Sequence, residues 1–100
     1  MIVSQLSPST CVGRGDALST EISGRLVLMN ARQGNYVSLD DVGNQIWQRL
    51  ERSMTVGDLC TELQALYDVE RPVLERDVIA FLESLLIQGL VAVVPAATGP

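Results

Sequence analysis

Short apolar runs in the first half of the chain alternate with turn residues and predict three β-strands. Residues Ala17–Ile22 alternate apolar and polar side chains, which is typical of a half-buried strand. Arg25–Met29 is nearly continuous in apolar residues, which indicates burial on both faces. The Asn and Gly residues between Asn30 and Gly34 suit a hairpin connection to a third strand, Asn35–Leu39, which is mixed in polarity. The three runs predict a small antiparallel meander.

Apolar residues recur at helical spacing in three later segments, which predict three helices, with Leu66 on the buried stripe of the second. Asp40 and Thr55 suit helix starts because they can cap free N–H groups, and Pro72 suits one because it has no N–H to leave unpaired. The expected ends lie near Ser53, near Tyr67 and at Gly89. Strands that precede helices, with a short β-prone run at Leu90–Val94 after them, predict an α+β fold that resembles a winged helix-turn-helix.

The chain has 100 residues, which allows one domain with a core of modest size. We expect this domain to span residues 17–94. Residues 1–16 are predicted to form a partly ordered, loosely packed arm with a weak strand signal at Ile2 and Val3. Residues 95–100 are predicted to be a disordered tail.

The charge pattern argues against a nucleic-acid partner. The formal net charge is −5, and the chain contains no lysine. The third predicted helix, which would enter a DNA groove, carries Glu75, Asp77 and Glu83 against Arg71 and Arg76. Phosphate contacts require clustered basic residues, so we expect a neutral or basic partner instead.

The chain has no histidine, which removes the commonest general base and the commonest metal ligand. Asp40 and Asp41 are adjacent carboxylates, but helix capping explains both. Cys11 and Cys60 lack CxxC spacing and are interpreted as free thiols. Cys60 lies on the apolar stripe of the second predicted helix, and Trp47 lies on that of the first, so both are expected in the core. We therefore predict no catalytic residue, no metal site and no cofactor.

The first residues contain no signal peptide, and no apolar run approaches the ~20 residues of a membrane span. We expect a cytoplasmic protein with no membrane partner.

The third predicted strand, Asn35–Leu39, is followed by no strand of comparable strength that could cover its edge. An uncovered edge is either protected or used to pair with another chain. That chain could be a peptide or a second copy of this protein, which would give a homodimer.

Several short motifs, taken in order, resemble the PqqD family of peptide-binding modules, also called RiPP recognition elements. The motifs are LVLMN in the second strand, G-x-Y-V-x-L-D at Gly34–Asp40, V-G-x-x-I-W at Val42–Trp47, T-V-x-D-L at Thr55–Leu59, the turn Tyr67-Asp68-Val69, D-V-x-x-F-L-x-x-L at Asp77–Leu85 and G-L-V at Gly89–Val91. The resemblance runs from about Leu18 to Val94. It implies a non-catalytic adaptor that binds the leader segment of a ribosomally made precursor peptide and presents it to a maturation enzyme. The resemblance leaves open whether that enzyme is a leader peptidase, a cyclase or a radical-SAM enzyme.

In this family the leader adds as an extra strand to the third strand and lies in a groove against the third helix. The resemblance therefore assigns the following strand residues to the site: Asn35, Tyr36, Val37, Ser38 and Leu39. Proline at position 37 is expected to weaken binding if the Val37 N–H faces the open edge.

Helical spacing directs one stripe of the third helix toward the core: Leu74, Val78, Phe81 and Leu85. The neighbouring flank is then the expected groove wall: Val73, Asp77, Ala80 and Ser84. The small Ala80 and Ser84 leave room for a leader side chain, and Arg76 or Asp77 could read its charge. The alternative function is a regulatory or structural winged-helix subunit without a leader ligand; an enzyme ranks third.

Overall fold

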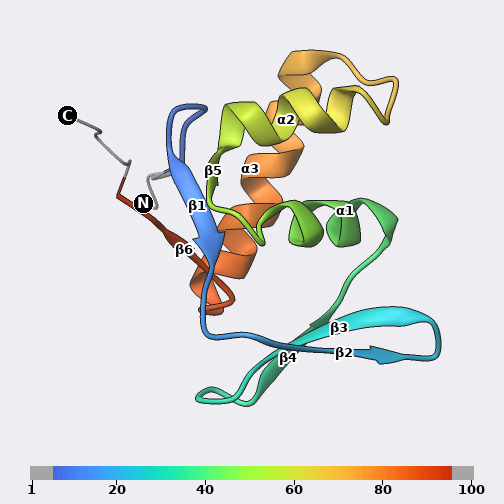
Figure 1. Ribbon diagram of the computed structural model, residues 1–100, viewed down its shortest axis with the longest axis vertical. Coiled ribbons are helices and arrows are strands. Elements are labelled where there is room, and N and C mark those ends of the chain that lie inside the picture. The colour runs from blue at the N-terminus through green and yellow to red at the C-terminus, as the bar shows by residue number, and fades with distance from the viewer. Residues whose placement is uncertain (1–5, 96–100) are drawn as a thin grey trace.

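The computed structural model describes residues 6–95 and has an α+β architecture (Figure 1). One antiparallel sheet has the strand order β2–β3–β4, with β2 at Leu18–Ile22, β3 at Arg25–Asn30 and β4 at Asn35–Ser38. Three helices follow: α1 at Asp41–Arg49, α2 at Val56–Gln64 and α3 at Arg71–Ile87. The predicted α+β class, with a three-stranded antiparallel sheet and then three helices, is confirmed.

A second antiparallel sheet was not predicted as a sheet. It places β1 (Cys11–Arg14) between β5 (Met54–Thr55) and β6 (Val91–Val93). The predicted terminal strand is confirmed as β6. Strands of two to four residues are too short to show an alternation in sequence, and their pairing depends on partners far along the chain.

The expectation of a loosely packed arm is wrong for the part of it that the structure describes. The side chains of Leu6 and Val12 are buried in the core, and β1 is the central strand of its sheet. The weak strand signal at Ile2 and Val3 and the tail after Pro95 lie outside the described residues. The domain limits at residues 17 and 94 stay predictions.

The helix starts follow the predicted caps. An Asp40 carboxylate oxygen accepts a hydrogen bond from the Gly43 N–H at 2.7 Å, and the Thr55 hydroxyl accepts one from the Asp58 N–H at 3.0 Å. Gly89 ends α3 with a φ of +73°, which glycine adopts at little cost. None of the helices within residues 6–95 is long and apolar enough to cross a membrane.

Two helices end earlier than the sequence predicts. Helix α1 ends at Arg49 and α2 at Gln64. The Leu66 N–H then bonds the Leu63 carbonyl three residues back, as in a tightened last turn. Leu66, predicted on a buried stripe, is consequently 52% exposed.

The core lies between the helices and the two sheets. Trp47 and Cys60 are buried there, as predicted. The Arg14 guanidinium lies 4.6 Å from the centroid of the Trp47 ring and donates to the Trp47 carbonyl at 2.7 Å, which ties β1 to the end of α1. Burial raises the pKa of the Cys60 thiol, with Arg71 opposing and Glu75 reinforcing the effect, so the thiol stays protonated at neutral pH.

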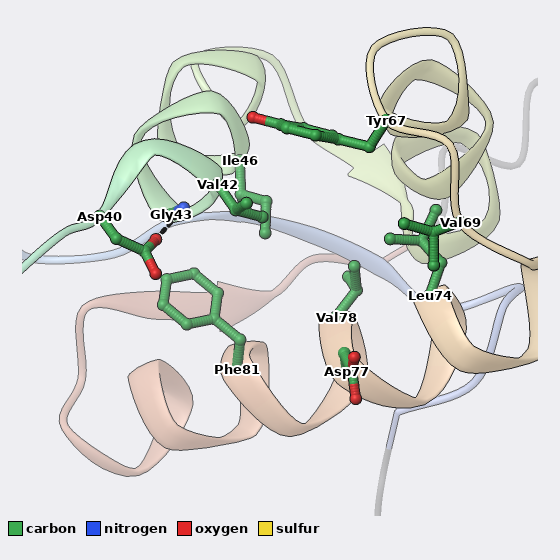
Figure 2. Close-up of a pocket in the computed structure, with 10 residues that line it drawn as sticks. All are labelled: Asp40, Val42, Gly43, Ile46, Tyr67, Val69, Leu74, Asp77, Val78 and Phe81. Atoms are coloured by element: carbon green, nitrogen blue, oxygen red, sulfur yellow. Dashed lines mark hydrogen bonds between the residues drawn. The ribbon is translucent and has the colours of Figure 1, made fainter.

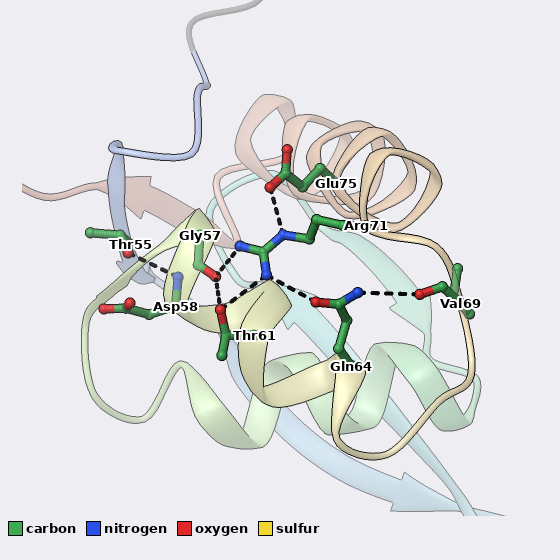
Figure 3. A network of polar contacts seen from close by, with 8 residues as sticks. All are labelled: Thr55, Gly57, Asp58, Thr61, Gln64, Val69, Arg71 and Glu75. Atoms are coloured by element: carbon green, nitrogen blue, oxygen red, sulfur yellow. Dashed lines mark hydrogen bonds and ion pairs between the residues drawn. The ribbon is translucent and has the colours of Figure 1, made fainter.

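Arg71, at the start of α3, joins α3 to α2 through its whole guanidinium group (Figure 3). It donates to the Gly57 carbonyl at 2.9 Å and to Thr61 and Gln64 side-chain oxygens at 3.0 Å each. Its Nε atom forms an ion pair with Glu75 at 2.6 Å. The planar guanidinium group has several N–H donors in fixed directions and can bond all of these acceptors. The ammonium group of a lysine would not fit them.

We expect Arg71→Met to lower the free energy of unfolding by roughly 1–3 kcal/mol, because charged hydrogen bonds are lost and the acceptors lose a partner. Urea denaturation followed by circular dichroism measures the change. Arg76→Met on the same helix is the control, since its side chain is 76% exposed and contacts Asp77 at 3.7 Å. Equal losses in the two variants would contradict a special role for Arg71.

Candidate functional site

Strand β4 is an edge strand that pairs only with β3 among the described residues. Val37 lies opposite Leu28, and the Leu39 N–H donates to the Leu26 carbonyl at 2.8 Å. In an antiparallel ladder, hydrogen-bonded pairs alternate with non-bonded pairs. Leu39 and Val37 therefore direct their backbone groups toward β3. Tyr36 and Ser38 direct theirs toward the open side, which offers two donors and two acceptors.

This alternation changes the expectation for proline at position 37. The N–H of Val37 faces β3, so the stated condition for the Val37 variant is not met. Proline there would break a bond within the sheet. The N–H groups on the open edge belong to Tyr36 and Ser38. The sequence alone does not determine which alternate residues of the strand face that edge.

The side chains of β4 divide between the two faces of the sheet. Val37 and Leu39 face the core together with Leu28. Tyr36 lies on the opposite face and is 73% exposed. Asn35, the first residue of the strand, is exposed near the β3–β4 turn.

Two contacts relate α3 to the β3–β4 hairpin and to the segment that follows it. The Asn30 side chain, buried at the end of β3, donates to the Gln88 carbonyl at 2.8 Å. Near the other end of β4, a Cβ atom built on Gly43 would lie 3.2 Å from the Phe81 ring and 3.4 Å from Leu39. Because Asn30 pairs with Asn35, these contacts place the start of β4 at the level of Gln88 and the residue after its end at the level of Phe81.

The predicted division of α3 into a core stripe and an exposed flank agrees with the burial of its side chains. Leu74, Val78 and Leu85 are buried, and Phe81 is half-buried. The flank residues are all exposed: Val73, Asp77, Ala80 and Ser84. Arg76 is also exposed, next to Asp77. Within this flank, Asp77 borders the cavity described next, and the other residues lie outside its lining.

A cavity of about 270 Å³ opens between α1 and α3, beyond the end of β4. Its lining residues are Asp40, Val42, Gly43, Ile46, Tyr67, Val69, Leu74, Asp77, Val78 and Phe81. Figure 2 shows the α1 and α3 side chains on opposite sides of this space, with the Tyr67 ring extending across from the segment between α2 and α3. The surface is predominantly apolar, and Asp40 and Asp77 supply its carboxylates.

Sequence reasoning gave no site role to Val42, Tyr67 or Val69, although each belongs to a quoted motif. Val42 belongs to the V-G-x-x-I-W motif, and its side chain is 38% exposed at the cavity. Membership in these motifs was the signal that the sequence offered, because the exposure of the three side chains is seen only in the structure. Gly43 allows the close contact between Phe81 and α1 because it has no Cβ atom.

Comparison with known proteins gives a consistent result. The family model described as Coenzyme PQQ synthesis protein D (PqqD) matches residues 25–91. TbiB1, solved in complex with the TbiA(beta) leader peptide, has a TM-score of 0.69 and 30% identity, covering 85% of this chain and 94% of TbiB1. A lasso peptide synthetase B1 complexed with the leader peptide has a TM-score of 0.69 and 32% identity, covering 79% and 93%. No curated protein sequence matches the chain.

We expect Asp40→Ala to lower the free energy of unfolding by about 1 kcal/mol, because the Gly43 N–H loses its capping partner. Chemical denaturation measures the loss. Asp40→Asn keeps an acceptor oxygen and should retain most of the stability. Asp41→Ala, one residue into α1, is the matched control with a smaller effect; a loss as large as that of Asp40→Ala would contradict the capping role.

Proposed function

Since the chain belongs to the PqqD family, we propose that it is a non-catalytic adaptor that binds the leader segment of a ribosomally made precursor peptide. The observation that carries this proposal is the open edge of β4, with the apolar cavity between α1 and α3 beyond its end. The two structural neighbours, each solved with a leader peptide, support it. They also favour a lasso-peptide pathway, in which the adaptor hands the precursor to a maturation enzyme such as a leader peptidase.

In this proposal the leader adds as a fourth strand next to β4. The backbone groups of Tyr36 and Ser38 form up to four hydrogen bonds with it, each worth roughly 0.5–1.5 kcal/mol net. Ordering a disordered segment costs about 2–5 kcal/mol or more, so backbone pairing alone gives little affinity. Leader side chains must supply the rest.

Every second side chain of the added strand points to the same face as Val37 and Leu39, toward α3. There it meets the flank that contains Ala80 and Ser84, two small residues that leave space. At the end of β4, the apolar cavity accepts an apolar leader side chain. Asp40 and Asp77 at the cavity favour a basic residue next to that anchor.

The proposed site therefore comprises one strand and one helix flank. The strand contributes Asn35, Tyr36, Val37 and Ser38, and Leu39 follows directly after it. The helix contributes Val73, Arg76, Asp77, Ala80 and Ser84. The cavity adds Val42, Tyr67 and Phe81 to this set.

We expect Ser38→Pro to weaken leader binding by about tenfold or more, because it removes one open-edge donor and places a ring where the leader backbone would lie. The fold should tolerate it, since the Ser38 N–H faces away from β3. Fluorescence anisotropy with labelled candidate leader peptides, the TbiA(beta) leader first, measures affinity.

Ser19→Pro is the matched control for this variant. The Ser23–Gly24 turn places Ser19 on the outer edge of β2 by the same alternation, so the control removes an edge donor on the other side of the sheet. It should leave leader affinity unchanged. If Ser38→Pro stays folded and binds as tightly as the wild type, strand addition at β4 is wrong. Failure of every leader to bind the wild type would remove the proposed function itself.

A second variant tests the helix wall of the groove. We expect Ala80→Arg to reduce leader affinity by about tenfold or more, because a long charged side chain fills the space beside β4. Ala65→Arg introduces the same exposed side chain at the end of α2 and should have no effect on binding. Anisotropy gives the affinities, and thermal unfolding checks that both variants fold. Unchanged affinity for Ala80→Arg would move the site elsewhere on α3.

A further inference from the structure

Asn30, the last residue of β3, is the one polar residue within residues 6–95 whose side chain is buried, with an exposed fraction of 3%. It lies on the same face of β3 as Leu28, which is completely buried. Met29 between them is 40% exposed, so the prediction that β3 is buried on both faces is wrong. A buried amide costs free energy unless its polar atoms are paired, so the partners of Asn30 indicate what it does.

Both polar atoms of the Asn30 side chain form hydrogen bonds. The oxygen accepts the Arg32 N–H at 2.9 Å and the Gln33 N–H at 3.3 Å, which stabilises the turn between β3 and β4. The Nδ2 atom donates to the Gln88 carbonyl at 2.8 Å, at the end of α3. One side chain therefore stabilises the turn that precedes β4 and also connects this turn to α3.

The end of α3 provides the acceptor and the space for this bond. The Gly89 N–H donates to the Leu86 carbonyl at 3.0 Å, as is common where a helix ends at a glycine. The Gln88 carbonyl accepts from Asn30. A Cβ atom built on Gly89 would lie 2.5 Å from the Nδ2 atom of Asn30, so glycine at this position also leaves room for the amide.

We propose that Asn30 is a positioning residue for leader binding, which holds the open edge of β4 at a fixed place relative to α3. This inference rests on the proposed leader-binding function. Asn30 pairs with Asn35, the first residue of β4, so its bond to Gln88 positions that end of the strand. Tyr36, whose backbone groups face the open edge, follows directly.

The Asn30–Gln88 bond matters because α3 packs mainly against α2 and β6, and the β3–β4 hairpin contributes little to its packing. At the other end of β4, Leu39 and Phe81 both lie close to Gly43 of α1. Loss of the bond therefore releases the start of β4, whereas the end of the strand stays in place.

Release of one end of β4 should weaken leader binding without changing any group that touches the leader. The leader strand bonds β4 while its side chains meet α3, so it binds the arrangement in which the two are correctly spaced. The apparent affinity falls in proportion to the fraction of molecules in that arrangement. Asn30 keeps this fraction high in the free protein.

The test uses Asn30→Ser, which keeps an oxygen that can accept an N–H in the turn but ends one bond short of the amide nitrogen. We expect leader affinity, measured by anisotropy, to fall about tenfold. Thr55→Ala is the control, because it removes the cap of α2 and lowers stability at a distance from β4. It should leave leader affinity within about twofold.

Amide hydrogen exchange separates positioning from a general loss of stability. In free Asn30→Ser, the amides of Gly34 and Val37 should exchange faster relative to those of α2, and bound leader should restore their protection. Thr55→Ala should not accelerate these hairpin amides relative to the rest of the chain.

Gly89→Ala provides an independent route to the same loss. Its Cβ atom would displace the Asn30 amide, so this variant should also weaken leader binding. The double variant Asn30→Ser/Gly89→Ala should bind within about twofold of the weaker single variant, because both changes remove one bond.

Wild-type leader affinity in Asn30→Ser, or equal losses in Asn30→Ser and Thr55→Ala, would overturn the positioning role and leave the proposed function intact. Additive losses in the double variant would also overturn it. If Asn30→Ser does not fold, wild-type affinity in Gly89→Ala has the same meaning. If the wild type itself binds no leader, the proposed function fails, and this inference fails with it.

Discussion

The register of β3 is the constraint on which the rest of the molecule depends. Alternate residues of this strand form hydrogen bonds with β2, and the residues between them form hydrogen bonds with β4. The assignment of residues to one side therefore determines the hydrogen bonding on both sides. The same assignment buries Leu28 and exposes Met29. A slip of one residue would send the core side chains to solvent and the open-edge donors of β4 to the wrong positions. Leu28, completely buried, is the anchor that makes such a slip unfavourable.

The junction between β4 and α1 places the proposed groove next to that sheet edge. The chain leaves the strand at Leu39, which is buried, and Asp40 then starts α1 by capping Gly43. Because Gly43 has no side chain, Phe81 of α3 approaches α1 closely while its ring borders the cavity. The end of β4, the start of α1 and Phe81 of α3 are therefore close together in space. None of these elements alone would offer both hydrogen-bonding groups and an apolar recess.

Local chemistry made much of the fold predictable. Capping by Asp40 and Thr55, the proline near the start of α3 and the glycine after it are short-range signals, and each lies where expected. Strand β1 was missed because Val12 gains its burial from residues 54 and 93, far away in sequence. The sequence also did not show which residues of β4 direct their backbone groups to the open edge, since this depends on the turn geometry at both ends of β3. Alternation in β2 was recognised, but the sequence does not state which side meets the core.

The candidate site was predictable in outline and not in detail. The strand and the exposed helix flank came from a family resemblance and helical spacing, whereas the cavity wall at Val42 and Tyr67 required three-dimensional contacts. Arg71 illustrates the same limit: in the sequence it was only one of the basic residues of the third predicted helix, yet it connects two helices.

Strands β1 and β6 are antiparallel neighbours, with Val12 opposite Val93, so the first and last described strands lie side by side. Figure 1 places this pair away from the β2–β3–β4 sheet. A domain whose two ends emerge together can be inserted into a loop of a larger protein with little distortion of either. This geometry is compatible with insertion into a longer chain, and the open edge of β4 belongs to the other sheet.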